Sequence, residues 1–483
     1  MHLTSTDVRQ HVSQAADQAR RTWSEEQLPS MAVAVCLDGQ AVTDHYWGSA
    51  DLETLAPARA DTAYLLASVT KSMTAVAVGL LAREGRLALG DAVDTLLGAP
   101  IPALPDCRQP TVRELLGHRA GVGRYYRFFY ADESAEKPAF RKTLSQTQIM
   151  TPPGSTFEYS NLGYGILDAV IEAVTGKQAG KATKELLERY IGPTSLSIGP
   201  SYAGSAASTA TRYGADGVAY PEYDVEHRGG TLAWMTISDL ARFGAACLAN
   251  GAIGRTGVID TLTGAPDEDS GYGLGWCVDE YAGIKAISHA GDMGGVSSYL
   301  LCFPDHGLSI AAVTNRTGSD APQSLAADVG SRVLTALCDR SVEVACPSPL
   351  VLPTPCALPA RLDGHWTGEL ETDEGKVAVG LSVSAGLASL DLDQDRADLS
   401  GFPTDSLDLR AAGRLDHAAE KVGSRETSVT VEARRFGDTL HGRIYVTDDL
   451  GARLRASLGE EGGAPALRFP NCVSYPILLR RDT

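Results

Sequence analysis

The pattern of apolar and polar residues changes near residue 345, and the two sides of this point predict different kinds of structure. On the N-terminal side, helical stretches alternate with short apolar runs typical of strands. The expected helices span residues 68–84, 111–117, 162–175, 236–250 and a last stretch that ends near residue 338. The pattern therefore predicts a mixed α and β region.

Two pairs of apolar runs in this region predict β-hairpins at its two ends. The first pair surrounds Asp38-Gly39, a turn signal, and the second is joined by a turn at Pro304–Gly307. Strands at both ends with helices between them favour an antiparallel sheet built from both ends of the region. The expected class is α+β.

The C-terminal region has a different texture. Stretches such as "GKVAVGLSVSAGLASLDLD" and "SVTVEARRFGDTLHGRIYV" alternate apolar and polar residues, with Gly and Asp at the breaks. This pattern predicts an all-β domain of about six to eight strands, a small barrel. Five prolines between Pro347 and Pro359 predict a stiff linker. We therefore expect domains at 1–345 and 361–483, joined by a linker at 346–360.

Composition narrows the classes of partner. The chain has 483 residues, 43% of them hydrophobic, and a net charge of −18. This charge disfavours nucleic acid and anionic membranes as partners. The polar N-terminus lacks the apolar segment of a signal peptide, and the nine cysteines form no CxxC pair. Reduced thiols and a cytoplasmic location are the expectation.

A serine and a lysine three residues apart are the first candidates for chemistry. Ser68 and Lys71 begin the apolar run "SVTKSMTAVAVGLLAREG". Residues i and i+3 share one face of a helix, and the first turn of a helix favours negative charge. Burial disfavours the charged form of a lysine, and a neutral Lys71 can serve as the base that activates Ser68. A second S-x-x-K, Ser134 with Lys137, lies in a polar stretch expected at the surface.

Two further stretches follow in order along the chain. "PPGSTFEYSNLGYGIL" contains Tyr159 and Asn161, and "KAISHAGDMGGVSSYL" contains His289-Ala290-Gly291. Serine, lysine, tyrosine-x-asparagine and H-x-G in this order resemble the serine β-lactamase and penicillin-binding-protein superfamily, above all its class C-like branch. The resemblance covers roughly residues 25–340. It implies a β-lactamase/transpeptidase-like catalytic domain, with an antiparallel sheet flanked by helices, followed by a lipocalin-like barrel.

The resemblance also implies a role for each matching residue. Ser68 would be the acylated nucleophile, and Lys71 and Tyr159 would share the role of base, with Tyr159 facing the leaving group. Asn161 would hold Lys71 and the acyl chain, and His289 would occupy the position of the third motif. The backbone N–H groups of Ser68 and Asp292, next to Gly291, would form the oxyanion hole.

The histidine departs from the K-T-G found at this position in β-lactamases and DD-peptidases of the superfamily. A histidine is mostly neutral at pH 7 and holds a substrate carboxylate less well than a lysine. The H-x-G variant resembles D-aminopeptidases, D-amino-acid amidases and esterases. A rival H-x-G, His227-Arg228-Gly229, resembles instead a turn that leads into a helix.

The expected function is an active-site serine hydrolase that cleaves amides or esters through an acyl-enzyme. Its substrates would be small molecules or short peptides with D-configured residues. One alternative is an acyltransferase or stand-alone peptide cyclase that uses the same acyl-enzyme, with a carrier protein or thioester as donor. A second alternative is a binding homologue without turnover. No metal or organic cofactor is implied, and no membrane or nucleic-acid partner.

Three features leave alternatives open. The five aromatics of "GRYYRFFYADE" are expected either to overhang the cleft and grip substrate or to pack on the core. Asp292 or Glu226 is a candidate to receive a substrate amine. The C-terminal barrel is expected either to reach the cleft with a loop or to serve as a packing module.

Overall fold

The computed structural model divides the chain into two compact units, each built from two separate stretches of sequence. The first unit comprises residues 1–91 and 164–348, and the second comprises residues 92–163 and 349–483. The structure describes residues 5–131, 137–145, 147–268, 270–345, 354–372, 375–393, 395–404, 407–416, 427–448 and 472–482.

A seven-stranded antiparallel sheet forms the centre of the first unit. Its strand order is β10-β11-β12-β13-β1-β2-β3. The strands are β10 (Cys277–Tyr281), β11 (Ile284–Met293), β12 (Val296–Phe303), β13 (Leu308–Thr314), β1 (Ser30–Leu37), β2 (Gln40–Asp51) and β3 (Ala56–Pro57). Because β1 pairs with β13, the N-terminal hairpin lies beside the last strands of the unit. The predicted sheet built from both ends of this region is confirmed.

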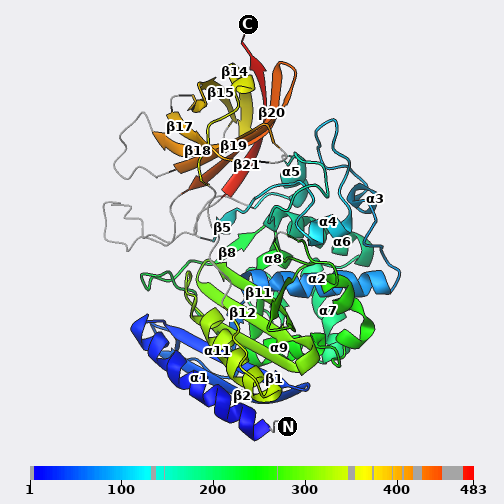
Figure 1. Cartoon of the computed structure of the whole chain (residues 1–483), viewed down its shortest axis with the longest axis vertical. Coiled ribbons are helices and arrows are strands. Elements are labelled where there is room, and N and C mark those ends of the chain that lie inside the picture. The colour runs from blue at the N-terminus through cyan, green and yellow to red at the C-terminus, as the bar shows by residue number, and fades with distance from the viewer. Residues whose placement is uncertain are drawn as a thin grey trace. The chain divides into compact units, whose positions relative to one another are not determined.

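Helices cover both faces of this sheet. On one face, α1 (Ser5–Glu25) and α11 (Ala321–Cys338) lie side by side (Figure 1) and share a core with Val33, Leu301 and Ile310. On the other face lies α9 (Ile237–Cys247), where Gly244 packs so closely that a Cβ would be 2.9 Å from Leu300. Successive strand residues point to opposite faces. Leu300 and Leu301 therefore belong to different layers.

The first unit also contains α2 (Thr70–Arg83), a helix whose residues 70–81 are all buried. The remaining elements of this part of the chain are β4 (Thr62–Leu65), η1 (Ala67–Val69), α6 (Asn161–Thr175), α7 (Ala179–Ile191), β6 (Ser197–Ile198), β7 (Ser208–Thr209), β8 (Tyr223–Val225), α8 (Arg228–Thr231), β9 (Ala233–Thr236), η2 (Gly254–Thr256), α10 (Val258–Thr263) and η3 (Pro304–His306). Helix α2 packs against α7, α8 and α10. Strands β6, β9, β4 and β7 form a small sheet in that order. Helix α6 starts in the second unit and continues in the first.

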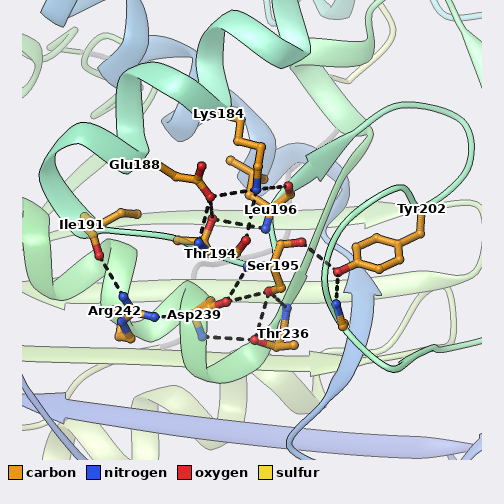
Figure 2. A network of polar contacts seen from close by, with 11 residues as sticks. Lys184, Glu188, Ile191, Thr194, Ser195, Leu196, Tyr202, Thr236, Asp239 and Arg242 are labelled. Atoms are coloured by element: carbon orange, nitrogen blue, oxygen red, sulfur yellow. Dashed lines mark hydrogen bonds and ion pairs between the residues drawn. The ribbon is translucent and has the colours of Figure 1, made fainter.

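A polar network fixes β9 and the start of α9 (Figure 2). Asp239 accepts hydrogen bonds of 2.7 Å from both the backbone N–H and the hydroxyl of Ser195. Thr236 caps α9 and also contacts Ser195, while Arg242 donates to the carbonyl of Ile191 at the end of α7. The network pins the turn after α7 to the junction of β9 and α9. It thereby fixes β9, which runs beside β4 directly before η1.

The second unit contains a closed antiparallel barrel of eight strands. These are β14 (Gly364–Thr372), β15 (Gly375–Ser384), β16 (Leu387–Leu392), β17 (Asp395–Gly401), β18 (Leu409–Asp416), β19 (Thr427–Phe436), β20 (Thr439–Asp448) and β21 (Cys472–Arg481), preceded by η4 (Ala360–Leu362). Trp366 is fully buried in its core. The prediction of a small barrel of six to eight strands is confirmed.

Residues 92–163 belong to the same unit as the barrel. They form α3 (Val93–Leu97), α4 (Val112–Leu116), β5 (Phe128–Tyr130) and α5 (Phe140–Ser145). The backbones of Tyr126 and Cys472 exchange two hydrogen bonds, of 2.9 and 2.8 Å, which joins this segment to the start of β21. The side chains of Arg434 and Asp106 add an ion pair with contacts of 2.6 and 2.8 Å.

The proposed boundaries at 345 and 361 stay predictions, and most of the proline-rich linker, residues 346–353, lies outside the described residues, as does Ser134. The eight cysteines that are described carry free thiols. Within the described ranges, no helix has both the length and the apolar character needed to cross a bilayer.

Candidate active site

The turn between β4 and α2 places Ser68. Ala67 has a φ of 46°, a left-handed conformation that is unfavourable for alanine and costs of order 1–3 kcal/mol. The hydroxyl of Thr70 donates to the carbonyl of Ala67 at 2.6 Å and helps to hold this conformation. Ser68 is half-buried, whereas its neighbours from Thr62 to Leu81 are buried. The strained turn therefore places Ser68 at the edge of the buried core, where its side chain is partly accessible.

The residue before this turn is anchored from two sides. The backbone N–H of Leu66 donates to the carbonyl of Ala233 at 2.8 Å, and the Leu66 carbonyl accepts from the Ser298 hydroxyl at 2.7 Å. Gly291 lies against the same carbonyl, since a Cβ on Gly291 would be 2.3 Å from it and 3.0 Å from the backbone nitrogen of Ser68. Strands β9, β11 and β12 thus fix the position of the serine.

Lys71 lies on the first turn of α2 and is fully buried. Its Nζ donates to Oγ of Ser68 at 3.1 Å and to the carbonyl of Gly230 at 2.9 Å. The ring of Tyr164 lies beneath the amine, with its centroid 5.4 Å from Nζ. Burial holds the pKa of Lys71 well below its usual range. The structure therefore brings together the two predicted residues, Ser68 and Lys71, with a lysine that loses its proton easily.

The rival H-x-G sequence lies at the start of the single-turn helix α8, which packs beside α2. His227 is fully buried. The backbone carbonyls of Gly229 and Gly230 accept hydrogen bonds from side chains of α2. The carbonyl of Gly229 accepts from the hydroxyl of Thr74 at 2.6 Å, and the carbonyl of Gly230 accepts from Lys71. The sequence predicted a turn here but not that its carbonyl would be a partner of the lysine.

His289 lies on β11, two residues before Gly291 and on the same face of the sheet. Its Nδ1 is 2.6 Å from the carbonyl of Ala290, and its Nε2 is 3.0 Å from the hydroxyl of Tyr272. Burial is the main cause that lowers the pKa of His289 to about 3, and the protonated form of Lys71 lowers it further. A neutral ring with its proton on Nδ1 satisfies both contacts, donating to the carbonyl and accepting from the phenol. The side chain therefore supplies no positive charge near pH 7.

Strand β11 continues beyond its pairing with β10. In the described part of the chain, β10 pairs with β11 only as far as Ser288, so residues 289–293 have no strand partner on that side. Unpaired backbone groups on such an edge can bind an extended substrate or an oxyanion. Asp292 contributes its backbone to this edge.

The carboxylate of Asp292 lies on the opposite face of the sheet from Gly291. It accepts from the backbone N–H of Gly318 at 3.0 Å and from the hydroxyl of Ser297 at 3.4 Å. Ala290, on the same face as Asp292, packs on the core of α1 and α11. This placement does not favour the hypothesis that the Asp292 side chain receives a substrate amine.

Tyr159 and Asn161 belong to the second unit, whereas Ser68, Lys71 and His289 belong to the first. The ring of Tyr159 packs on that of His118, with centroids 4.2 Å apart, and Asn161 is the first residue of α6. Both line a cavity of about 570 Å³ in the second unit. Its other lining residues are Arg124, Tyr125, Tyr126, Thr151, Thr156, Phe157, Glu158, Pro403, Thr404, Leu407, Arg410, Glu432 and Arg443.

The aromatic residues at 125–130 lie in two different environments, and their expected contact with substrate stays a prediction. Tyr125 and Tyr126 line the cavity. Phe128, Phe129 and Tyr130 form β5 and are buried.

Sequence reasoning did not identify two tyrosines, one of which contacts Lys71 and the other His289. Tyr164 follows Tyr159 by five residues, and Tyr272 lies in "GYGLGW", a stretch that the resemblance includes. Each touches a predicted residue, at 5.4 Å from Lys71 and 3.0 Å from His289. Tyr164 lies in the first turn of α6 and Tyr272 lies in the loop before β10, and neither position gave a local signal of this contact.

Comparison with known proteins identifies the family. Residues 8–333 match the sequence profile of the Beta-lactamase family. The chain is 25% identical over 356 residues to Unguisins hydrolase ungD' of Aspergillus campestris, covering 68% of this chain and 65% of that protein. It is 25% identical to the D-aminopeptidase of Brucella melitensis biotype 2, covering 90% of this chain and 82% of the relative.

A solved structure shares the fold over most of the chain. SurE, determined with D-Leu, superposes with a TM-score of 0.59 at 22% identity, covering 89% of this chain and 97% of SurE. The profile match spans both the strand–turn–helix that carries Ser68 and Lys71 and the strand that carries His289. The chain is a member of the Beta-lactamase family.

Proposed function

We propose that this protein is an active-site serine hydrolase that cleaves amide or ester bonds in small peptides, amides or esters with D-configured residues. The observation that carries the proposal is the fully buried amine of Lys71, 3.1 Å from the hydroxyl of Ser68. A serine becomes an effective nucleophile when a base within hydrogen-bond distance takes its proton. The lowered pKa of Lys71 provides that base.

In the proposed acylation, Oγ of Ser68 attacks the substrate carbonyl carbon while Nζ of Lys71 accepts the hydroxyl proton. The backbone N–H groups of Ser68 and Asp292 stabilise the oxyanion that forms. One such donor contributes about 2.7–4 kcal/mol in other acyl-transfer enzymes. The close approach of Gly291 to the Ser68 nitrogen supports this assignment.

Acylation is completed when the bond to the leaving nitrogen or oxygen breaks. Tyr159 delivers its proton to that atom and regains one from the Lys71 ammonium, while Asn161 holds the acyl chain. In the second half of the reaction, water attacks the ester on Ser68, Lys71 accepts the proton of the water and returns it to Oγ of Ser68, and the free acid leaves. The place of Tyr159 and Asn161 at one cavity supports a common role for them.

The preference for D-configured substrates is supported by the relatives. One is a D-aminopeptidase, and SurE was solved with D-Leu. The neutral ring of His289 supports substrates that need no cation at that position, such as amides, esters and peptide amines. β-Lactams, which carry a carboxylate, are expected to acylate slowly.

The test is intact-mass analysis after mixing the protein with matched D- and L-aminoacyl thioesters in the presence of a free amine. A transient adduct is expected on the wild type with the D donors, absent in Ser68→Ala, followed by release of free acid. An amide product would favour the acyltransferase or peptide cyclase. An adduct that never clears would favour a binding homologue, and an adduct on Ser68→Ala would overturn the assignment of the nucleophile.

A further inference from the structure

The loop that carries Tyr159 is held on both sides of this residue. On the C-terminal side, the backbone N–H of Ser160 donates to Nδ1 of His118 at 3.0 Å, and the Ser160 hydroxyl donates to the carbonyl of Gly123 at 2.6 Å. On the N-terminal side, the backbone N–H of Glu158 donates to the carbonyl of His118 at 2.7 Å. These contacts come from residues 92–163 themselves.

The side chain of Glu158 is held by the barrel instead. Arg443 on β20 places Nη2 3.0 and 2.9 Å from the two carboxylate oxygens of Glu158. The hydroxyl of Tyr445, two residues along the same strand, lies 3.4 Å from Glu158. The residue before Tyr159 is thus tied to a strand almost 300 positions away in the sequence.

Arg443 belongs to a cluster of two carboxylates and two guanidinium groups, the Glu158 cluster, made of Glu158, Glu432, Arg410 and Arg443, of which Glu432 and Arg443 are buried. Arg443 donates to Glu432 through Nε at 3.0 Å and through Nη2 at 2.8 Å, and Arg410 lies 3.3 Å from Glu432. The side chains of Arg443 and Glu432 are only 3% and 4% exposed. Removing one partner of such a buried pair leaves a charge without compensation.

The charges of the cluster keep Arg443 ionised. Burial alone lowers the pKa of an arginine, but Glu158, Tyr445 and Glu432 outweigh it and raise the pKa of Arg443. Gly123 makes room for the guanidinium, because a Cβ there would lie 2.0 Å from Nη1 of Arg443 and 2.4 Å from the Tyr445 hydroxyl. Gly123 also has a φ of 76°, which favours glycine. The same glycine therefore contacts both Arg443 and, through its carbonyl, Ser160.

We propose that Arg443 is a positioning residue for Tyr159, acting through Glu158, so that the C-terminal barrel is a required part of the reaction centre. The role of Tyr159 in this statement rests on the proposed function. Arg443, Glu158, Tyr159 and Asn161 line one cavity, so a shift of the cluster changes the place where the tyrosine acts. The barrel holds the Tyr159 loop through the ion pair of Arg443 with Glu158. A domain that served only for packing would not require such an ion pair at this loop.

The chain offers a matched control in the same unit. Arg434 on β19 pairs with Asp106, and this pair also ties the barrel to residues 92–163. Its side chains are 19% and 42% exposed, and neither residue lines the cavity. Arg434→Gln removes an ion pair between the same two segments without touching the Tyr159 loop.

The test compares Glu158→Ala, Glu158→Gln, Arg443→Gln and Arg434→Gln in the full chain. The first readout is acylation of Ser68 by the N-acetylcysteamine thioester of N-acetyl-D-phenylalanine. Glu158→Ala and Arg443→Gln are expected to lower the acylation rate constant about 10–100-fold, as loss of an orienting partner does in metal sites, with KM unchanged. Glu158→Gln, which keeps an acceptor oxygen, should lie between them and the wild type, and Arg434→Gln should stay within about twofold of the wild type.

The second readout is hydrogen exchange of the backbone amides at Glu158, Ser160 and Gly163, which needs no substrate. Without denaturant, exchange by local opening of the loop should be at least about tenfold faster in Glu158→Ala and Arg443→Gln. Arg434→Gln, which weakens the unit as a whole, should leave this local opening at the wild-type rate. Arg443→Gln can unfold the barrel because it leaves a buried carboxylate without its partner. If the two variants give different results, the result for Glu158→Ala is therefore the one that tests the proposal. Wild-type acylation and exchange in Glu158→Ala, or equal losses in Arg434→Gln, would overturn the proposal. A wild type that accepts no acyl donor while the loop amides respond as expected would overturn the proposed function and keep the positioning contact.

Discussion

Lys71 can act as a base only while its amine is neutral, so acylation of Ser68 should depend on pH through this residue. Because burial lowers the pKa of Lys71 well below its usual range, acylation should rise with pH up to that lowered pKa and remain level above it. Lys71→Ala should lower the rate by about 10²–10⁴-fold and retain the fold. Mass-spectrometric acylation rates between pH 5 and 9, with circular dichroism of the variant, check both points. A near-wild-type acylation rate in Lys71→Ala would show that Lys71 is not the base that activates Ser68.

His289 should stay neutral throughout the same pH range. Its pKa is lowered to about 3, chiefly by burial, so it should gain a proton only under strongly acidic conditions. Nitrogen-15 NMR should show the tautomer protonated on Nδ1 from pH 5 to 9, with Nε2 accepting from Tyr272. In Tyr272→Phe the Nε2 resonance should shift because the donor is lost. An imidazolium signal near pH 6 would contradict the proposed electrostatics.

Residue spacing could predict only part of this site. Ser68 and Lys71 share a helix turn, so their contact follows from the sequence, and the H-x-G stretch indicated a neutral residue in place of a lysine. The carbonyl of Gly230 carries no side-chain signal, yet it lies 2.9 Å from the Lys71 amine. Contacts made by backbone atoms distant in sequence cannot be inferred from residue type.

At the scale of elements, the packing of β11 against the turn before α2 leaves no room for a side chain at Gly291. A Cβ would lie 2.3 Å from the Leu66 carbonyl and 3.0 Å from the Ser68 nitrogen. Gly291→Ala should therefore push β11 from the serine and lower acylation by about 10²-fold or more, the effect of losing one oxyanion donor. Gly90→Ala is the control, because nothing lies within 4 Å of its Cβ position. Equal acylation rates in the two variants would show that the position of β11 does not affect acylation of Ser68.

Helices and strands were predictable where apolar runs are long. The expected helices at 68–84, 162–175 and 236–250 correspond to α2 with η1, α6 and α9, with ends that differ by a few residues. The left-handed Ala67 was not predictable, because alanine disfavours that conformation and only the surrounding hydrogen bonds impose it. The strain that presents Ser68 is thus a property of several elements together.

At the scale of the whole molecule, the barrel could be predicted and its partner segment could not. Alternating residues identify the strands locally. The grouping of residues 92–163 with the barrel depends on pairs such as Asp106 with Arg434 and Glu158 with Arg443. Among 60 acidic and 42 basic residues, no local pattern marks which distant charges will meet.

Residues 92–163 and the barrel should therefore unfold as one cooperative unit. Hydrogen exchange at increasing urea concentrations should open the amides of α4 and of β20 at the same midpoint, since their shared contacts include backbone hydrogen bonds and two ion pairs. Arg434→Gln should lower both midpoints together, because it weakens the joint rather than either part. If the amides of α4 exchanged at the same midpoint as those of α2 in the first unit while β20 stayed protected, residues 92–163 and the barrel would unfold independently. The barrel would then not stabilise the Tyr159 loop.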